Sequence, residues 1–98
     1  MTPLEKTASI LNGNYKIRLN ARQKCFDVAW SLGYNIFAIQ DGGQCFGLNA
    51  AKDEYKNYGA STECLDDGKG GPLANAVYKI ETGKRLWVVS EMPKEYCH

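Results

Sequence analysis

Apolar side chains between residues 21 and 32 recur with the spacing of an α-helix that buries one face. Asn20 stands where its side-chain oxygen can cap the first turn, Gln23 occupies the third helical position, and Gly33 can adopt the left-handed conformation that ends a helix. We therefore predict a main helix over about 21–32 that packs across a sheet. Its inner face is expected to contain six residues: Ala21, Cys25, Phe26, Ala29, Trp30 and Leu32.

The segments after this helix have the composition of antiparallel strands. Residues 34–40 are rich in aromatic and β-branched side chains and end at a turn over 41–43, after which 44–47 can return as the partner strand. Farther on, 76–80 and 85–90 are β-rich runs separated by four residues that include a glycine, and we predict that they pair as a hairpin.

The remaining segments predict shorter elements and loops. Residues 49–58 have an asparagine cap, a row of small and tyrosine side chains and a glycine stop, which together predict a short second helix. The stretch 60–72 has turn composition throughout. Residues 1–18 look irregular, with a hairpin or bend expected at Asn12 and Gly13. The expected fold class is a small α+β domain that occupies 1–98 as one unit.

Four cysteines lie far apart in the chain, without the paired spacing of a zinc knuckle or a thioredoxin motif. Their even number in a short chain favours two disulfides and an oxidising compartment. Spacing alone does not select one of the three possible pairings. The expected helix and strand, however, carry Cys25 and Cys45 on facing elements, and we predict a bond between them.

Charge and hydropathy exclude two classes of partner. The chain has 12 basic and 11 acidic residues, a net charge of +1, and no run of like charge, so nucleic-acid binding is not expected. No stretch approaches the roughly 20 apolar residues of a membrane span, so membrane insertion is not expected either.

Several sequence segments resemble a WSC-type domain over about residues 20–65. The resemblance rests on the helix cysteine and on three runs, 33–40 (GYNIFAIQ), 43–47 (GQCFG) and 57–64 (NYGASTEC). Members of that family carry a second cysteine pair, and the matching positions here hold Ala29 and Gly47, so both halves of one disulfide are absent together. The later runs 68–72 (GKGGP) and 76–80 (AVYKI) resemble a cysteine-poor invertebrate variant, although Leu73 replaces its tryptophan.

The resemblance implies a secreted module, or one on the extracellular face of a larger protein, with a PAN/apple-like fold in which a helix crosses an antiparallel sheet. It implies carbohydrate binding and no catalytic residues. WSC-type chains open with a strand that this N-terminus lacks, and the tail from 85 to 97 extends beyond their last strand. If the tail replaces that missing strand, Cys64 pairs with Cys97.

The candidates for catalysis are poor, and we expect no enzyme, no cofactor and no metal site. His98 is the only histidine and is expected at a frayed, solvated chain end, which is unsuited to acid–base work. Asp66 and Asp67 are adjacent, so they do not share a face, and their loop lacks the spaced acidic series of a calcium site.

Sugar binding needs an aromatic side chain against the apolar face of a pyranose ring, with amides or carboxylates for the hydroxyls. A protein–protein module using the same tyrosines is the alternative, and the sequence does not separate the two; the oligomeric state stays open. Trp87 also suits a position in the core. The candidate ligand contacts near the predicted turns are Gln40, Asp41, Gln44, Tyr55, Asn57, Tyr58 and Trp87.

Overall fold

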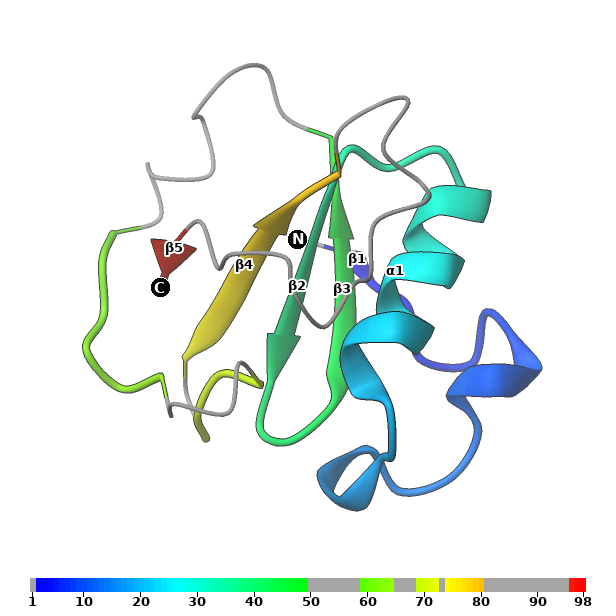
Figure 1. Cartoon of the computed structure of the whole chain (residues 1–98), viewed down its shortest axis with the longest axis horizontal. Coiled ribbons are helices and arrows are strands. Elements are labelled where there is room, and N and C mark those ends of the chain that lie inside the picture. The colour runs from blue at the N-terminus through cyan, green and yellow to red at the C-terminus, as the bar shows by residue number, and fades with distance from the viewer. Residues whose placement is uncertain (1, 50–58, 65–68, 73, 81–95) are drawn as a thin grey trace.

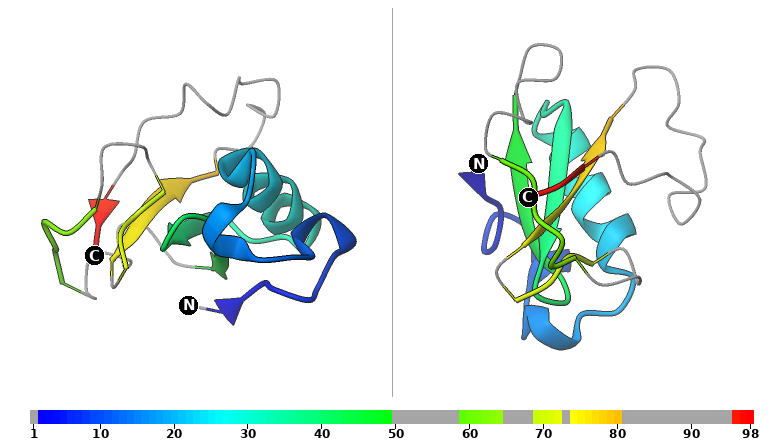
Figure 2. Two further views of the ribbon diagram at one scale, coloured as in Figure 1. Left: turned by 90° about the horizontal axis from the view of Figure 1, so that it is seen from below. Right: turned by 90° about the vertical axis from the view of Figure 1, so that its left-hand side faces the viewer.

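Five antiparallel strands form one sheet, and an α-helix crosses one of its faces (Figures 1 and 2). The computed structural model describes residues 2–49, 59–64, 69–72, 74–80 and 96–98. The strand order is β1-β3-β2-β4-β5, so the two shortest strands lie at the two edges. The predicted α+β class, with disulfides linking its elements, is confirmed. The elements are β1 (Thr2–Pro3), the 3-10 turns η1 (Ser9–Leu11) and η2 (Tyr15–Ile17), α1 (Ala21–Ser31), β2 (Ile36–Gln40), β3 (Gln44–Leu48), β4 (Asn75–Lys79) and β5 (Tyr96–Cys97).

The ends of α1 lie where the sequence predicts, but the predicted N-terminal cap is wrong. Asn20 has a left-handed backbone, with φ of 52°, and its side chain makes no capping hydrogen bond. The side-chain amide of Gln23 donates to Asp27, at 2.8 Å, and so points along the helix and not back to its start. At the other end Gly33 has φ of 82° and its amide donates to the Trp30 carbonyl, which confirms the predicted stop.

The inner face of α1 differs from the prediction at two positions. Leu32 is 51% exposed, because the helix has ended at Ser31 and the chain turns away through Gly33. Val28, which we did not place on this face, is buried, since it lies one turn from the completely buried Cys25. Trp30 is only partly buried and lies against the Phe26 ring, with 5.9 Å between the ring centroids.

Strand alternation supplies the other half of the core. Phe37 and Ile39 of β2 and Ala76 and Tyr78 of β4 point towards the helix and are fully buried. The rings of Phe37 and Tyr78, which are partners in the register of β2 and β4, stack with 4.9 Å between centroids. This contact joins the two strands across the centre of the sheet.

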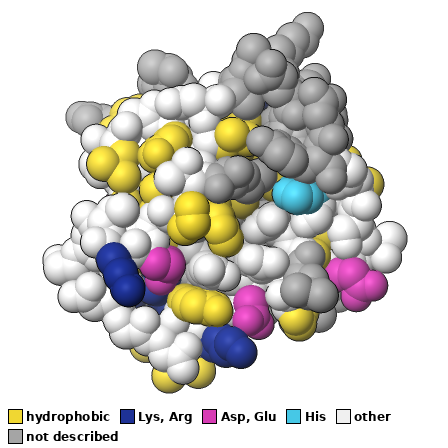
Figure 3. Space-filling model, turned by 180° about the vertical axis from the view of Figure 1, so that it is seen from behind, with side chains coloured by type: hydrophobic (Ala, Val, Ile, Leu, Met, Phe, Trp, Pro, Cys, Tyr) yellow, Lys and Arg dark blue, Asp and Glu magenta, His cyan; other side chains and the backbone are white. Residues whose placement is uncertain are grey.

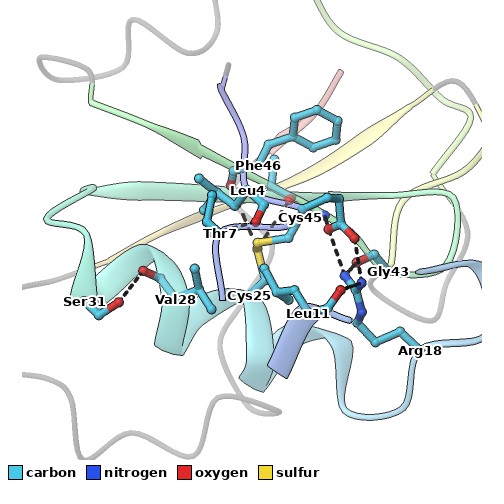
Figure 4. The surroundings of a disulfide bond; sticks show 12 residues. Leu4, Thr7, Leu11, Arg18, Cys25, Val28, Ser31, Gly43, Cys45 and Phe46 are labelled. Carbon is cyan, nitrogen blue, oxygen red and sulfur yellow. Dashed lines mark hydrogen bonds and ion pairs between the residues drawn. A yellow bond between two sulfur atoms is a disulfide. The ribbon is translucent and has the colours of Figure 1, made fainter. Parts of the chain in front are cut away.

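Both expected disulfides are present among the described residues. Cys25 of α1 and Cys45 of β3 are bonded with 5.4 Å between their Cα atoms, and both are completely buried (Figure 4). Cys64 and Cys97 are bonded with 6.1 Å between Cα atoms, and both are half-exposed.

The edges of the sheet correct the expectation for the two chain ends. β1 pairs with β3, so the N-terminus does provide a short strand. β5, which lies at the end of the tail, pairs with β4 at the opposite edge. The tail therefore does not replace an N-terminal strand. Of the hairpin or bend expected at Asn12 and Gly13, the structure has a bend at Gly13, with φ of 96°, between η1 and η2.

Two predicted elements lie outside the described residues. These are the body of the second helix, 50–58, and the run 85–90 that was expected to pair with 76–80. Within the described part of the chain, β4 has β2 and β5 as its neighbours.

Candidate functional site

The face of the sheet opposite α1 carries side chains of mixed character, and apolar groups gather near its centre (Figure 3). Alternation along β2, β3 and β4 assigns every second residue to this face, which we call the helix-free face. It has a polar row across one end of the strands and an apolar row beside it.

The polar row consists of Gln44, Gln40, Asn75 and His98, on four consecutive strands. Gln40 is the register partner of both Gln44 and Asn75. Asn75 and His98 form backbone hydrogen bonds in both directions, which continues the β4–β5 pairing by one residue. Because directly opposed residues of antiparallel strands share a face, the four side chains lie in one line about 14 Å long, at roughly 4.8 Å per strand.

The hydrogen-bonding capacity of this row is only partly used. The Asn75 side-chain nitrogen lies 3.3 Å from Nε2 of His98, whereas its Oδ1 is buried and has no partner. Burial of the imidazole lowers the pKa of His98 below its ordinary value of 6.5 and so favours the neutral ring. The amides of Gln40 and Gln44 are half-exposed and make no side-chain hydrogen bond to any residue that the structure describes. A buried acceptor without a partner costs free energy, so the Asn75 side chain is held here at a cost to stability.

The apolar row runs parallel to the polar one. Phe46 and Val77 are both register partners of Ala38, and Tyr96 is the partner of Val77. Ala38 and Val77 are completely buried in the middle, and the two aromatic side chains are partly buried against them on either side. Two aromatic side chains therefore flank the centre of the face next to a line of amides.

The predicted ligand contacts divide into three groups. Gln40 and Gln44 lie on the helix-free face. Asp41 lies in the adjoining turn, with φ of 51°, and its carboxylate is 3.7 Å from the Lys16 ammonium, so its charge is paired with Lys16. The other four candidates fall outside the described residues: Tyr55, Asn57, Tyr58 and Trp87.

Sequence reasoning missed four members of the helix-free face. Phe46 could have been found, because it lies two positions from Gln44 on the same expected strand. Asn75 and Tyr96 join the face only through pairings between distant segments, which the sequence does not indicate. The expectation for His98 was wrong: it is half-buried and hydrogen-bonded to Asn75, because β5 extends the sheet to the end of the described chain.

Close approach of backbone segments fixes the turn beside this face. A Cβ atom on Gly42 would lie 2.5 Å from the Lys16 carbonyl oxygen, and one on Gly43 would lie 2.7 Å from the Tyr15 carbonyl oxygen. The two glycines therefore let η2 pack directly on the β2–β3 turn, and this contact positions both Gln40 and Gln44.

Comparison with protein-family models finds no match, and neither do comparisons with curated proteins and with solved structures. Of the helices in the described part of the chain, none combines the length and apolar content needed to cross a bilayer. Within these described residues, no group of three or more histidine, cysteine, aspartate or glutamate side chains is arranged to hold a metal ion.

Proposed function

We propose that this domain is an extracellular carbohydrate-binding module of the WSC type, without catalytic activity, and that the helix-free face binds the sugar. The observation that carries the proposal is the line of amides, Gln44, Gln40 and Asn75, beside the aromatic side chains of Phe46 and Tyr96. Two disulfides in a chain of 98 residues support an oxidising, extracellular location.

The chemistry of the face matches that of a pyranose ring. Amide groups donate and accept hydrogen bonds, so neighbouring glutamines can bind adjacent sugar hydroxyls without a charge. Phe46 and Tyr96 supply apolar surface for the C–H face of the ring.

A glycan array followed by calorimetric titration of the best sugar tests this proposal. Gln40→Ala and Gln44→Ala should each weaken binding about fivefold to tenfold, because each removes roughly 1–1.4 kcal/mol of hydrogen bonding. Gln23→Ala is the matched control, since Gln23 is an exposed amide on α1, across the sheet from the helix-free face.

The same titration covers the predicted contacts outside the described residues through Tyr55→Ala, Asn57→Ala, Tyr58→Ala and Trp87→Ala. If the sugar binds saturably and Gln40→Ala and Gln44→Ala leave its affinity unchanged, the binding site lies outside the helix-free face. No binding to any glycan would reject the lectin-like function.

A protein–protein recognition module is the second candidate, and one observation favours it. Ile17 and Leu19 are 76% and 77% exposed, while the charged Arg18 between them is buried. Large apolar side chains held outwards in this way are typical of protein interfaces. A specific pull-down that is lost on Ile17→Ser and Leu19→Ser, together with no sugar binding, would favour this candidate over the first.

A further inference from the structure

The two disulfides differ in their access to solvent. Cys25 and Cys45 are completely buried between α1 and the sheet, whereas Cys64 and Cys97 are both half-exposed. Thiol–disulfide exchange requires a thiolate to reach a sulfur atom. The Cys64–Cys97 bond is therefore more accessible to a reductant than the Cys25–Cys45 bond, although Cys64 also packs against the core cluster.

The accessible bond holds the weakest strand of the sheet. β5 has two residues, Tyr96 and Cys97, and lies at the edge beside β4, far from α1 (Figure 1). Its attachments include the backbone pairing of Asn75 with His98, a hydrogen bond from the Ser61 amide to the Cys97 carbonyl, and the packing of Tyr96 against Val77. So short an edge strand is marginal by itself, and the link to Cys64 supplies the missing constraint.

β5 carries two of the groups on the helix-free face. Tyr96 packs against the cluster formed by Ile36, Ala38 and Val77. His98 forms the end of the polar row and contacts the Asn75 side chain. Release of β5 would remove both groups together, whereas Gln40, Gln44 and Phe46 would keep their places on β2 and β3.

We propose that the Cys64–Cys97 disulfide is a redox-sensitive latch: its reduction by a dithiol releases β5 and disables the helix-free face, while the rest of the domain stays folded. In the first step a thiolate of the dithiol attacks one sulfur, the S–S bond breaks and a mixed disulfide forms. The second thiol of the reductant then displaces the remaining cysteine. Two electrons and two protons pass to the protein, Cys64 and Cys97 become thiols, and the dithiol becomes a disulfide. Only the consequence for sugar binding rests on the proposed function.

Graded reduction of the native 98-residue chain with dithiothreitol tests the latch. After alkylation, peptide mass spectrometry should find Cys64 and Cys97 labelled at reductant concentrations that leave Cys25 and Cys45 unlabelled. At the same concentrations, the Asn75 amide, which donates to the His98 carbonyl, should lose its protection against hydrogen exchange. Amides in the middle of α1 should keep theirs.

Either of two results would overturn the latch. One is reduction of the two disulfides in parallel, and the other is unchanged exchange at Asn75 after selective reduction. The variant Cys64→Ser/Cys97→Ser provides a second measurement, because it should reproduce the exchange pattern of the reduced protein with α1 intact; global unfolding of this variant would also contradict the proposal.

These readouts contain no sugar, so they separate the latch from the proposed function. Where a glycan binds the oxidised domain, selective reduction should abolish its binding. If no glycan binds at all, the proposed function fails while exchange and alkylation still decide on the latch. Retained sugar affinity after β5 has been released would show that Tyr96 and His98 are not part of the binding face.

Discussion

Replacing Arg18 with methionine tests how the N-terminal segment is attached to the sheet. The Arg18 guanidinium is buried and donates four hydrogen bonds (Figure 4). Two reach the Glu5 carboxylate, at 2.9 and 2.6 Å, one reaches the Gly43 carbonyl at 2.7 Å and one reaches the Leu11 carbonyl at 2.6 Å. Glu5 in turn accepts from the Cys45 amide at 2.9 Å. One side chain thus joins η1, the β2–β3 turn and the strand that carries the buried disulfide.

The expected loss of stability follows from what the substitution leaves behind. Methionine retains much of the apolar stem, but it leaves two carbonyl groups and a carboxylate without the guanidinium as their hydrogen-bond donor. Removal of one partner from a buried ion pair costs about 3–5 kcal/mol. The Glu5 side chain is 19% exposed, so water can solvate it in part, and we expect a value near the lower end, about 3 kcal/mol. That is a large share of the roughly 5–15 kcal/mol of a typical domain.

Urea unfolding of Arg18→Met, Glu5→Gln and the double variant measures this coupling. Glu5→Gln keeps the shape of the side chain and an acceptor for the Cys45 amide, so it should cost less than Arg18→Met. The loss in the double variant should be smaller than the sum of the two single losses, because the first substitution already removes the ion pair.

The same pair makes a pH-dependent contribution. Burial by itself would raise the pKa of Glu5, but the Arg18 hydrogen bonds, the Cys45 amide and the Arg18 charge together lower it below 4.5. Stability from this group is therefore complete above about pH 4.5 and is lost as the pH falls through the lower value of the folded state. The difference between wild type and Glu5→Gln should shrink over that window. A loss below about 1 kcal/mol for Arg18→Met, with additive variants and no such pH dependence, would refute the reasoning.

Two further comparisons use matched positions. Gly43→Ala should destabilise more than Gly47→Ala in the same urea assay, because the new methyl group meets the Tyr15 backbone carbonyl of η2 at the first site and the Tyr34 side chain at the second. Equal losses would contradict the close approach of η2. Val28→Ala should cost about 2 kcal/mol, since Val28 is buried in the core, whereas Leu32→Ala should cost less than about 1 kcal/mol. A larger loss for Leu32→Ala than for Val28→Ala would instead support the predicted inner face, which contained Leu32 and not Val28.

The sequence predicted the parts of the fold that depend on local patterns. The helical period and Gly33 located α1, and the turn over 41–43 located β2 and β3, because the residues that define these elements are close together in the chain. The facing of α1 and β3 then indicated the Cys25–Cys45 bond. Arg18 was not predicted inside the core, because a charged residue is buried only when distant partners such as Glu5 and Gly43 satisfy it.

The candidate site, like the fold, could be predicted only where its residues lie close together in the chain. Gln40 and Gln44 adjoin one turn, so a local argument reached both. Asn75 and His98 lie in the same row only because β4 pairs with β2 and β5 pairs with β4, at separations of more than 20 residues from their partners. Pairings of that range depend on contacts between distant segments, such as the stacking of Phe37 and Tyr78 between β2 and β4, and no short pattern encodes them.

The helix-free face joins two regions that are held in different ways. Its β3 end is secured by the buried Cys25–Cys45 bond and by the Glu5 contact with the Cys45 amide. Its β5 end is linked to Cys64 by the half-exposed Cys64–Cys97 bond. Under the proposed function, a ligand that contacts both Gln44 and His98 needs β5 in place, so its binding should stabilise the β4–β5 pairing. By the same linkage, breaking the Cys64–Cys97 bond should weaken the binding of that ligand.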